Sequence, residues 1–441
     1  MNVWAARRVR AVAILISVFS FGALGADSAA VAGENFSGAV VRAWNDVAIS
    51  TVRIKSASDA QAARLYAMVD AAIYDAVNGI ASRHSGPGND RRHALVPPSG
   101  APPHGHPVAA AAAAAHAVLV GIYPDQAAVF DSQLAADLAP LQPNSRVSAG
   151  QAWGAAVGAA VLTARAADGS SPAETQPAGT GPGVFRAAWS GVQFRNLAPF
   201  AIANPAVYVG AGPPSLTSLD YAAAFAEIYL LGNAAIPDAD KLATYNYWSL
   251  GGGTSQPPGA WLQVARAVSS SLDLERTARL FALVSMALAD TVAPTYMTKF
   301  IFRFWRPTTA IREADTDGNP NTNPDVNWSA RAGTVGGTPE YWSGHSSFSA
   351  AAATILAGFF CNDDIPFTLV TDSAPGGLAR SYPSFSAAAA EAGRSRVVGG
   401  IHFEIDGNQE GLRAGRAIGS EVLKTSLLLK KGMTHFGACP L

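Results

Sequence analysis

Three short segments in the C-terminal half of the chain carry residues that could bind and activate an oxyanion. The first places Lys299 seven residues before Arg306, among aromatic residues. On one continuous helix, residues seven apart lie two turns apart on nearly the same face, so both cations would point the same way. Pro307 is expected to end this helix, which leaves Arg306 able to reach another element.

The second segment is Ser343-Gly344-His345, which directly precedes an alanine-rich run of helical character. This position predicts a helix N-terminus, where backbone N–H groups are unpaired and the helix dipole is positive. Gly344 would let an anion approach the backbone closely, and the Ser343 hydroxyl would add a donor. The segment therefore predicts an anion cradle.

The third segment contains Arg396, His402 and Asp406. A Gly-Gly pair at 399–400 precedes a helix expected to begin near residue 401, on which His402 and Asp406 would be neighbours four residues apart. The carboxylate would then set the tautomer and orientation of the imidazole.

Each segment alone also has an ordinary explanation: a solvated helix face, a loop or cap, and a surface ion pair. Together, three cations, two histidines and a helix N-terminus in apolar surroundings favour a tetrahedral oxyanion. At an effective dielectric of about 20, a cation about 4 Å from a unit charge contributes roughly 4 kcal/mol before desolvation. Three cations could then hold a multiply charged oxyanion without a metal cation.

The pattern K-x6-R-P, S-G-H and S-R-x5-H-x3-D resembles the three-part signature shared by vanadium-dependent haloperoxidases and type 2 phosphatidic acid phosphatases. The resemblance covers residues 272–419 most closely and points to the exported bacterial branch of the haloperoxidases. It implies vanadate as the cofactor, with phosphate able to occupy the same site. In that case His402 bonds vanadium, and the vanadate oxygens are held by Lys299, Arg306, Ser343, the Gly344 N–H and Arg396.

The same resemblance implies hydrogen peroxide, a halide and an organic acceptor as reaction partners. It makes His345, His402 and Lys299 the catalytic residues. His345 would act as the acid–base group, and Lys299 would polarise the bound peroxide so that the halide leaves as hypohalous acid.

Two further positions bear on the pocket. Tyr296 stands three residues before Lys299, where the family carries an aromatic residue, although core packing explains it equally well. Thr338 stands five residues before Ser343, where relatives that oxidise chloride or bromide carry Phe or His. The sequence therefore does not identify the halide substrate. Bromide or iodide is favoured because both are easier to oxidise than chloride.

Two alternatives use the same residues. An exported acid phosphatase would have His402 attack phosphorus while His345 protonates the leaving group. A non-catalytic relative would bind an oxyanion without turning over a substrate. The long N-terminal half argues against a small acid phosphatase, and the expected lack of membrane-spanning helices argues against a lipid phosphatase.

The composition of the 441-residue chain indicates a folded helical protein. Hydrophobic residues make up 49% and charged residues 14%, which excludes a mostly disordered chain. Apolar residues recur at helical spacing, and alternating strand patterns are nearly absent. The expected fold is all-α, and the resemblance implies two packed helical bundles with long irregular connecting loops, as in vanadium chloroperoxidase.

The chain divides into three expected parts. Arginines followed by an apolar run indicate a signal peptide at 1–32, since the run is shorter than the ~20 residues of a spanning helix. Export to the periplasm or the medium is therefore expected. A Pro- and Gly-rich stretch at 169–214 separates an N-terminal helical region at 33–215 from a C-terminal domain at 216–441 that carries the site.

The net charge limits the kinds of binding partner that the chain can have, and the cysteine content limits its disulfides. A net charge of -1 supplies no general field for nucleic acid or an anionic membrane surface. No stretch beyond the signal peptide is expected to span a membrane, because the alanine-rich segments are interrupted by Asp, Arg, Gly or Pro. Cys361 and Cys439 are either core residues or a single disulfide. The sequence leaves the oligomeric state open.

Overall fold

The computed structural model describes residues 36–84 and 92–428, apart from the side chain of Asp406. The predicted signal peptide and Cys439 lie outside the described residues. The described residues belong to one compact unit.

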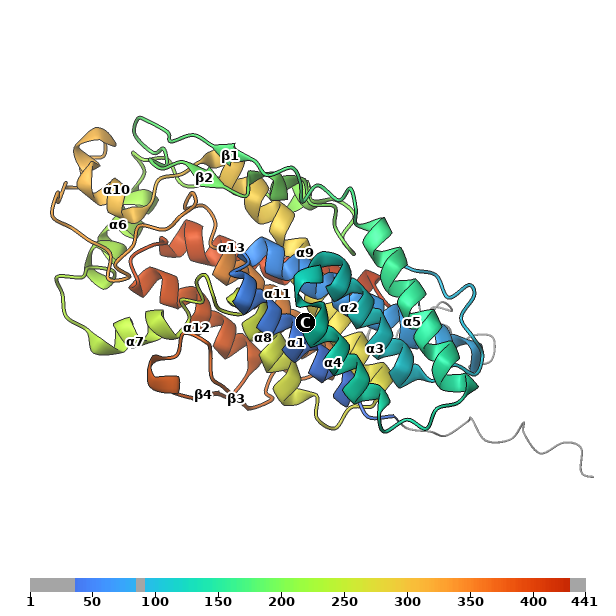
Figure 1. Cartoon of the computed structure of the whole chain (residues 1–441). Helices are drawn as coiled ribbons and strands as arrows, with labels where there is room; N and C mark the ends of the chain where they lie inside the picture. The colour runs from blue at the N-terminus through green and yellow to red at the C-terminus, as the bar shows by residue number, and fades with distance from the viewer. Residues whose placement is uncertain (1–35, 85–91, 429–441) are drawn as a thin grey trace, which may run out of the picture. The chain divides into compact units, whose positions relative to one another are not determined.

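The all-α fold is confirmed by the order of the elements (Figure 1). The helices before residue 270 are α1 (Ala39–Lys55), α2 (Asp59–His84), α3 (Pro107–Ile122), α4 (Ala127–Leu138), α5 (Ser145–Ala164), α6 (Leu219–Leu231), α7 (Ala239–Tyr247) and α8 (Gln256–Val268). The later helices are α9 (Leu274–Phe302), α10 (Pro307–Arg312), α11 (Gly344–Phe360), α12 (Phe385–Val398) and α13 (Glu410–Thr425).

Short elements connect these helices. Two small antiparallel pairs join β1 (Thr175–Gln176) to β2 (Trp189–Ser190) and β3 (Phe367–Leu369) to β4 (Arg380–Tyr382). The single-turn helices are η1 (Pro124–Gln126), η2 (Val192–Asn196), η3 (Pro205–Tyr208), η4 (Ala314–Thr316) and η5 (Pro375–Gly377), and the π-helix η6 spans Glu404–Gln409.

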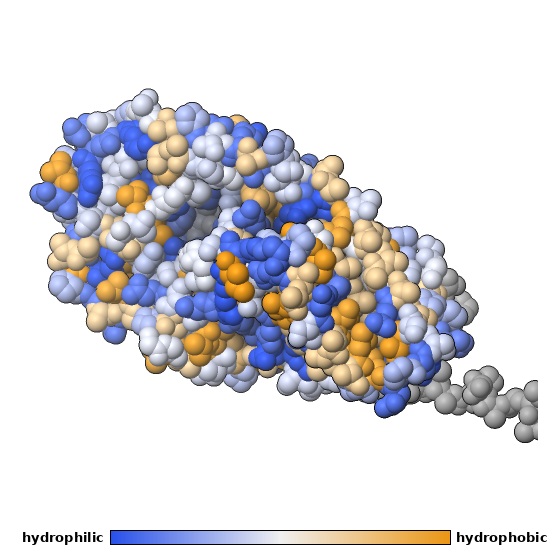
Figure 2. Space-filling model, viewed as in Figure 1, coloured by the Kyte–Doolittle hydropathy of each residue, from blue (hydrophilic) through white to orange (hydrophobic). Residues whose placement is uncertain are grey.

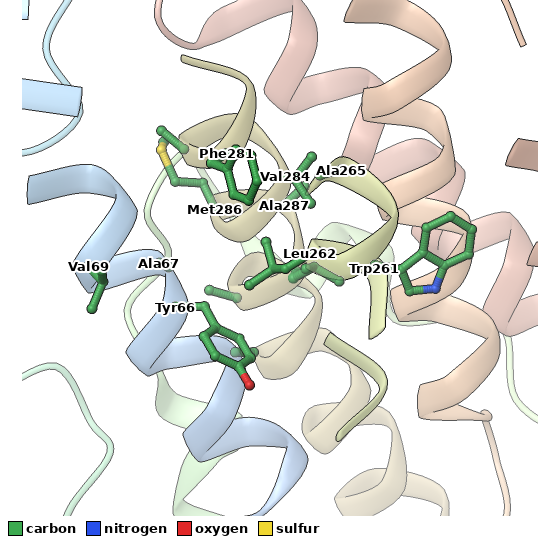
Figure 3. Close-up of a cluster of buried hydrophobic side chains, with 14 of the residues drawn as sticks. Tyr66, Ala67, Val69, Trp261, Leu262, Ala265, Phe281, Val284, Met286 and Ala287 are labelled. Atoms are coloured by element: carbon green, nitrogen blue, oxygen red, sulfur yellow. The ribbon is translucent and has the colours of Figure 1, made fainter. Parts of the chain in front are cut away.

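Helix α9 forms the centre of the hydrophobic core. It packs against α2 and α8, and Figure 3 shows buried side chains that these three helices contribute to the core. The labelled members are Tyr66, Ala67 and Val69 of α2, Trp261, Leu262 and Ala265 of α8, and Phe281, Val284, Met286 and Ala287 of α9. Since α9 also packs on α11, the core fixes the start of α11 relative to Lys299, near the end of α9.

Glycines at four-residue intervals bring α13 directly onto α11. A Cβ on Gly415 would lie 2.1 Å from the carbonyl oxygen of Ser347, and one on Gly419 would lie 2.8 Å from that of Ala351. Such separations are shorter than a carbon–oxygen contact allows, so the two helices pack this closely only with glycine at these positions.

Two groups of helices pack among themselves. Helices α2, α3 and α5 contact one another, as do α11, α12 and α13, and α9 contacts both α2 and α11. In Figure 1 the first group is coloured blue to green and the second orange to red. One cluster of buried hydrophobic residues extends from Val40 to Leu427. The domain division at residue 215 stays a prediction.

Most helices lie where the sequence predicts them, but the helix that carries Lys299 ends earlier than expected. Arg303 adopts a left-handed backbone with φ of 46°, so α9 stops at Phe302. Arg306 then precedes a new helix, α10, in which Pro307 occupies the first turn, where proline is favoured. The prediction that Lys299 and Arg306 share one helix is therefore wrong.

The helix expected from residue 401 also begins later. His402 lies in a bend after Gly400, whose φ is 80°, and η6 starts only at Glu404. Because His402 precedes the helix, the four-residue helical spacing assumed for His402 and Asp406 does not apply. The side chain of Asp406 lies outside the described part of the structure, and its supporting role stays a prediction.

Two helices of the described chain, α5 and α9, are long and apolar. By length and composition alone, α5 and α9 could each cross a membrane, but one or two such helices also occur in the cores of other proteins. In α9, however, 94% of the most apolar window is buried within the protein, as in a core helix. On the face shown in Figure 2, hydrophobic and hydrophilic residues are interspersed, and a group of hydrophobic residues lies in the region of α3 and α4.

Candidate oxyanion-binding site

The first and third motif segments are joined through the guanidinium of Arg306. Its Nη1 lies 2.9 Å from Nε2 of His402 and also donates to the carbonyl of Ile401, while Nε donates to the carbonyl of Thr338 at 2.7 Å. Arg306 therefore links the start of α10 to the loop before α11 and to the bend before η6. The predicted approach of the first and third segments is present.

His402 is held from its other side by Glu340, a residue that the sequence did not single out. The imidazole Nδ1 lies 3.0 Å from Oε1 of Glu340, and the backbone N–H of Phe403 donates to the same oxygen at 3.0 Å. Both His402 and Glu340 are buried. Since a carboxylate only accepts, Nδ1 carries the proton and Nε2 presents its lone pair toward Arg306.

The second segment forms the predicted helix N-terminus. Ser343 is the N-cap of α11, and its hydroxyl oxygen accepts the backbone N–H of Ser346 at 3.3 Å. The hydroxyl proton of Ser343 is therefore available for donation. Gly344 is the first residue of α11, where a backbone N–H has no carbonyl partner within the helix. A Cβ at Gly344 would meet no protein atom closer than 3.6 Å, so protein packing alone does not require glycine there.

His345 follows in the first turn of α11 and is half-buried. Its Nε2 lies 3.1 Å from the carbonyl oxygen of Ser249, which makes Nε2 the protonated nitrogen and leaves Nδ1 with a lone pair. Burial and the charge of Arg396 lower the pKa of His345 well below its ordinary value. The imidazole is therefore neutral near pH 7 and able to accept a proton.

Arg396 comes from the last turn of α12 and stacks 5.0 Å from the ring centre of Tyr245. Its Nη1 donates to the carbonyl of Trp248 at 3.3 Å. Within residues 36–84 and 92–428, its buried Nε has no hydrogen-bond acceptor. A buried donor without a partner is costly, so this atom fits a ligand oxygen.

The charges of the site also favour an anion. Burial and the nearby charge of Arg306 lower the pKa of Lys299 well below its ordinary value. Burial likewise lowers the pKa of Arg306 to about 10, an effect that Glu340 opposes and Arg396 strengthens. A negative ligand among the three cations would relieve their repulsion. In the described part of the chain, no three His, Cys, Asp or Glu side chains are grouped to chelate a metal cation.

Comparison with known proteins finds similarity to one group of proteins, in sequence over the C-terminal half and in fold over most of the chain. A family model described as the VCPO second helical-bundle domain matches residues 279–431. The vanadium chloroperoxidase of Curvularia inaequalis is 26% identical over 200 residues, which cover 37% of this chain and 32% of that protein. The match thus spans less than half of the curated relative.

Two solved structures share the fold. A structure described as the first bacterial vanadium-dependent iodoperoxidase superposes with a TM-score of 0.71 at 20% identity, covering 90% of this chain and 98% of that chain. The apo form of a bacterial vanadium-dependent chloroperoxidase superposes with a TM-score of 0.60 at 16% identity, covering 82% and 92%. The chain is vanadium haloperoxidase-like.

In this vanadium haloperoxidase-like chain, three residues near the motif segments make hydrogen bonds to different partners. Thr338 contacts Arg306 through its carbonyl and, at 3.4 Å, through its hydroxyl. Tyr296 is buried and donates its hydroxyl to Asp59 at 3.0 Å, so it is more than a packing residue. Trp342 is fully buried and donates to Thr295 at 3.0 Å.

Lys299 is buried and is held by the loop before α11. Its ammonium donates to the carbonyls of Pro339 and Glu340. A lysine carries three protons, so one donor remains for a ligand. The structure thus brings the predicted cations and His345 within electrostatic reach of His402. Glu340, Tyr245 and Asp59 contact members of this group or a neighbouring side chain.

Proposed function

We propose that the chain is a vanadate-dependent peroxidase that uses hydrogen peroxide to oxidise a halide to hypohalous acid. The observation that carries this proposal is the buried chain of contacts from Glu340 through His402 to Arg306. It presents one imidazole lone pair among three buried cations. A tetrahedral oxyanion bonded to His402 matches that donor set.

The residues present fit vanadate. Lys299, Arg306 and Arg396 would neutralise its charge, and the Ser343 hydroxyl and the Gly344 N–H would hold further oxygens. The buried Nε of Arg396 would gain the acceptor that it lacks within the described residues. When bound, vanadate would supply a Lewis-acidic centre for peroxide activation.

Glu340 orients the imidazole of His402 for bonding to vanadium. By accepting the Nδ1 proton, the carboxylate fixes the ring with Nε2 directed into the site and raises the basicity of that nitrogen. The hydrogen bond from Arg306 to Nε2 would be exchanged for one to an oxyanion oxygen when His402 becomes a ligand.

His345 and Lys299 act on hydrogen peroxide, the first as a proton acceptor and the second as a hydrogen-bond donor. Nε2 of His345 is committed to the Ser249 carbonyl, so Nδ1 is the atom that accepts a proton from the incoming peroxide. The third proton of Lys299 would hydrogen-bond the peroxide and draw electron density from the oxygen that the halide attacks.

For the halide, we propose bromide or iodide in preference to chloride. Thr338 supplies a small polar side chain at a position where relatives that oxidise chloride or bromide carry Phe or His. The similar bacterial structure described as an iodoperoxidase supports the same choice. Equal turnover of chloride in a monochlorodimedone assay would overturn it.

Phosphate chemistry is the second candidate, because the Glu340–His402 pair also suits a nucleophilic imidazole. In that case His402 would attack phosphorus to form a phosphohistidine that water then hydrolyses. His345 would first take up a proton on Nδ1, favoured once the bound anion offsets Arg396, and would give it to the leaving group.

The deciding experiment compares both activities in one preparation. The chain is loaded with orthovanadate and tested for peroxide-dependent oxidation of iodide, bromide and chloride, and without vanadate for hydrolysis of p-nitrophenyl phosphate. His402→Ala should abolish the peroxidase activity, whereas His116→Ala, which changes a surface histidine paired with Asp131, should not. Phosphate hydrolysis without halide oxidation would favour the phosphatase. Binding of vanadate without either activity would indicate a non-catalytic relative.

A further inference from the structure

A carboxylate from the N-terminal half of the chain reaches the oxyanion site. Asp59 lies in the first turn of α2, 237 residues before Tyr296, whose hydroxyl donates to Oδ1 at 3.0 Å. The backbone N–H of Ala60 donates to the same oxygen at 2.7 Å. These two bonds hold the carboxylate against α9 through Oδ1.

The second oxygen of Asp59 faces the start of α11. Oδ2 lies 3.6 Å from the position that a Cβ on Gly344 would take, so it is close to the backbone predicted to cradle the oxyanion. Because Tyr296 and Ala60 both donate to Oδ1, Oδ2 keeps acceptor capacity on the Gly344 side. Asp59 as a whole is half-buried, so it lies at the margin of the core and not deep inside it.

The charge of Asp59 is coupled to the site. Burial raises the pKa of Asp59, and the hydrogen bonds from Tyr296 and Ala60 and the nearby ammonium of Lys299 oppose that shift. Tyr296 and Lys299 are one helical turn apart on α9. A helix start favours an acidic residue through the dipole, which accounts for an aspartate on α2. The dipole does not account for its bond to Tyr296 or for the approach of Oδ2 to Gly344.

We propose that Asp59 determines which oxyanion the site prefers, a proposal that rests on the proposed function. Its Oδ2 accepts a hydrogen bond from a protonated oxygen of the ligand and repels each further negative charge that the ligand carries. Near neutral pH, orthovanadate is mainly a monoanion with two protonated oxygens, whereas inorganic phosphate is largely a dianion with only one. Asp59 therefore selects vanadate over phosphate, and Tyr296 positions it.

The test measures binding, not turnover. Dissociation constants of the full chain for orthovanadate and for inorganic phosphate are determined separately by calorimetry at pH 7.5. Asp59→Asn keeps the shape, removes the charge and offers an amide donor to a deprotonated oxygen. We expect phosphate to bind about tenfold more tightly relative to vanadate than in the wild-type chain. Asp59→Ser, which keeps a residue suited to a helix start, should change the ratio in the same direction.

Two controls separate selectivity from structure. Asp125→Asn removes an exposed acidic partner of Lys55 and should leave both constants unchanged. Tyr296→Phe keeps the charge of Asp59 but removes the bond that positions it, so it should shift the ratio toward phosphate by less than Asp59→Asn does. An unchanged ratio in both Asp59 variants would overturn the inference while leaving the proposed function intact. If the wild-type chain binds neither oxyanion, the proposed function fails and the inference fails with it.

Discussion

Glu340 and His402 lie 62 residues apart in the sequence and are joined by a buried contact of 3.0 Å between Oε1 and Nδ1. The same carboxylate oxygen accepts the N–H of Phe403, so it fixes both the imidazole and the backbone that follows it. The backbone carbonyl of Glu340 also accepts a hydrogen bond from Lys299 at 3.4 Å. One residue thus positions the proposed vanadium ligand and one of the cations.

Replacing Glu340 should weaken vanadate binding without removing any group that touches vanadate. In Glu340→Ala, Nδ1 of His402 loses its buried acceptor, and we expect the dissociation constant to rise about 10- to 100-fold. Glu340→Gln keeps one acceptor oxygen and should lie between this variant and the wild type. Calorimetric titration with orthovanadate measures the change.

A matched control is Glu313→Gln, which removes a partly exposed ion pair with Arg186 and should bind vanadate as the wild type does. Wild-type affinity in Glu340→Ala would show that the carboxylate does not prepare His402.

His345→Ala should separate chemistry from binding. Because Nδ1 of His345 is proposed to accept a proton from peroxide, its loss should lower kcat by about 10²- to 10⁴-fold. The vanadate dissociation constant should change only slightly, since the oxyanion is held mainly by the cations and His402. Steady-state kinetics with iodide and a parallel binding titration test this. Equal losses in binding and in kcat would instead assign His345 to holding the cofactor.

Arg396→Met should change the response of stability to the ligand. A methionine of similar length removes a buried charge whose Nε lacks an acceptor within the described residues, so the melting temperature without oxyanion should stay the same or rise. In the wild type, vanadate at about 100 times its dissociation constant should add about 2.7 kcal/mol to the free energy of unfolding. The variant should lose most of this gain.

Thermal unfolding with and without orthovanadate gives both values. Arg276→Met, which changes a highly exposed arginine on α9, should keep the vanadate response of the wild type. A large loss of stability in Arg396→Met without ligand would mean that the stacking on Tyr245 outweighs the burial of the charge.

Some residues of the site could be predicted from the sequence alone, and others could not. Arg306, Ser343 and His402 were predicted because each fills a position in one of three short motifs that together resemble a known signature. Glu340 carries no such pattern, since it is one carboxylate before an aromatic pair and its partner lies 62 residues later. Asp59 is further removed, on a helix of the N-terminal half, and only tertiary packing brings it to Tyr296.

The predicted end of helix α9 was wrong because a local backbone conformation, which the sequence pattern does not reveal, decides it. The apolar pattern of α9 continues beyond Phe302, and the left-handed backbone of Arg303 that ends the helix leaves no trace in that pattern. The helix ranges themselves were predictable because their apolar spacing is repeated over many residues, whereas one backbone angle decides where a helix stops.

The protonation of His345 should respond to the oxyanion. Burial and Arg396 hold its pKa below the ordinary value of about 6.5. The unfolded chain therefore binds more protons than the folded chain as pH falls through about 6.5, so this group makes the oxyanion-free protein less stable toward lower pH. A bound anion offsets Arg396, raises the pKa of His345 and reduces that loss. Ring NMR titrations with and without orthovanadate, assigned with His345→Ala, measure both pKa values, and a pKa unmoved by vanadate would place the anion away from α11.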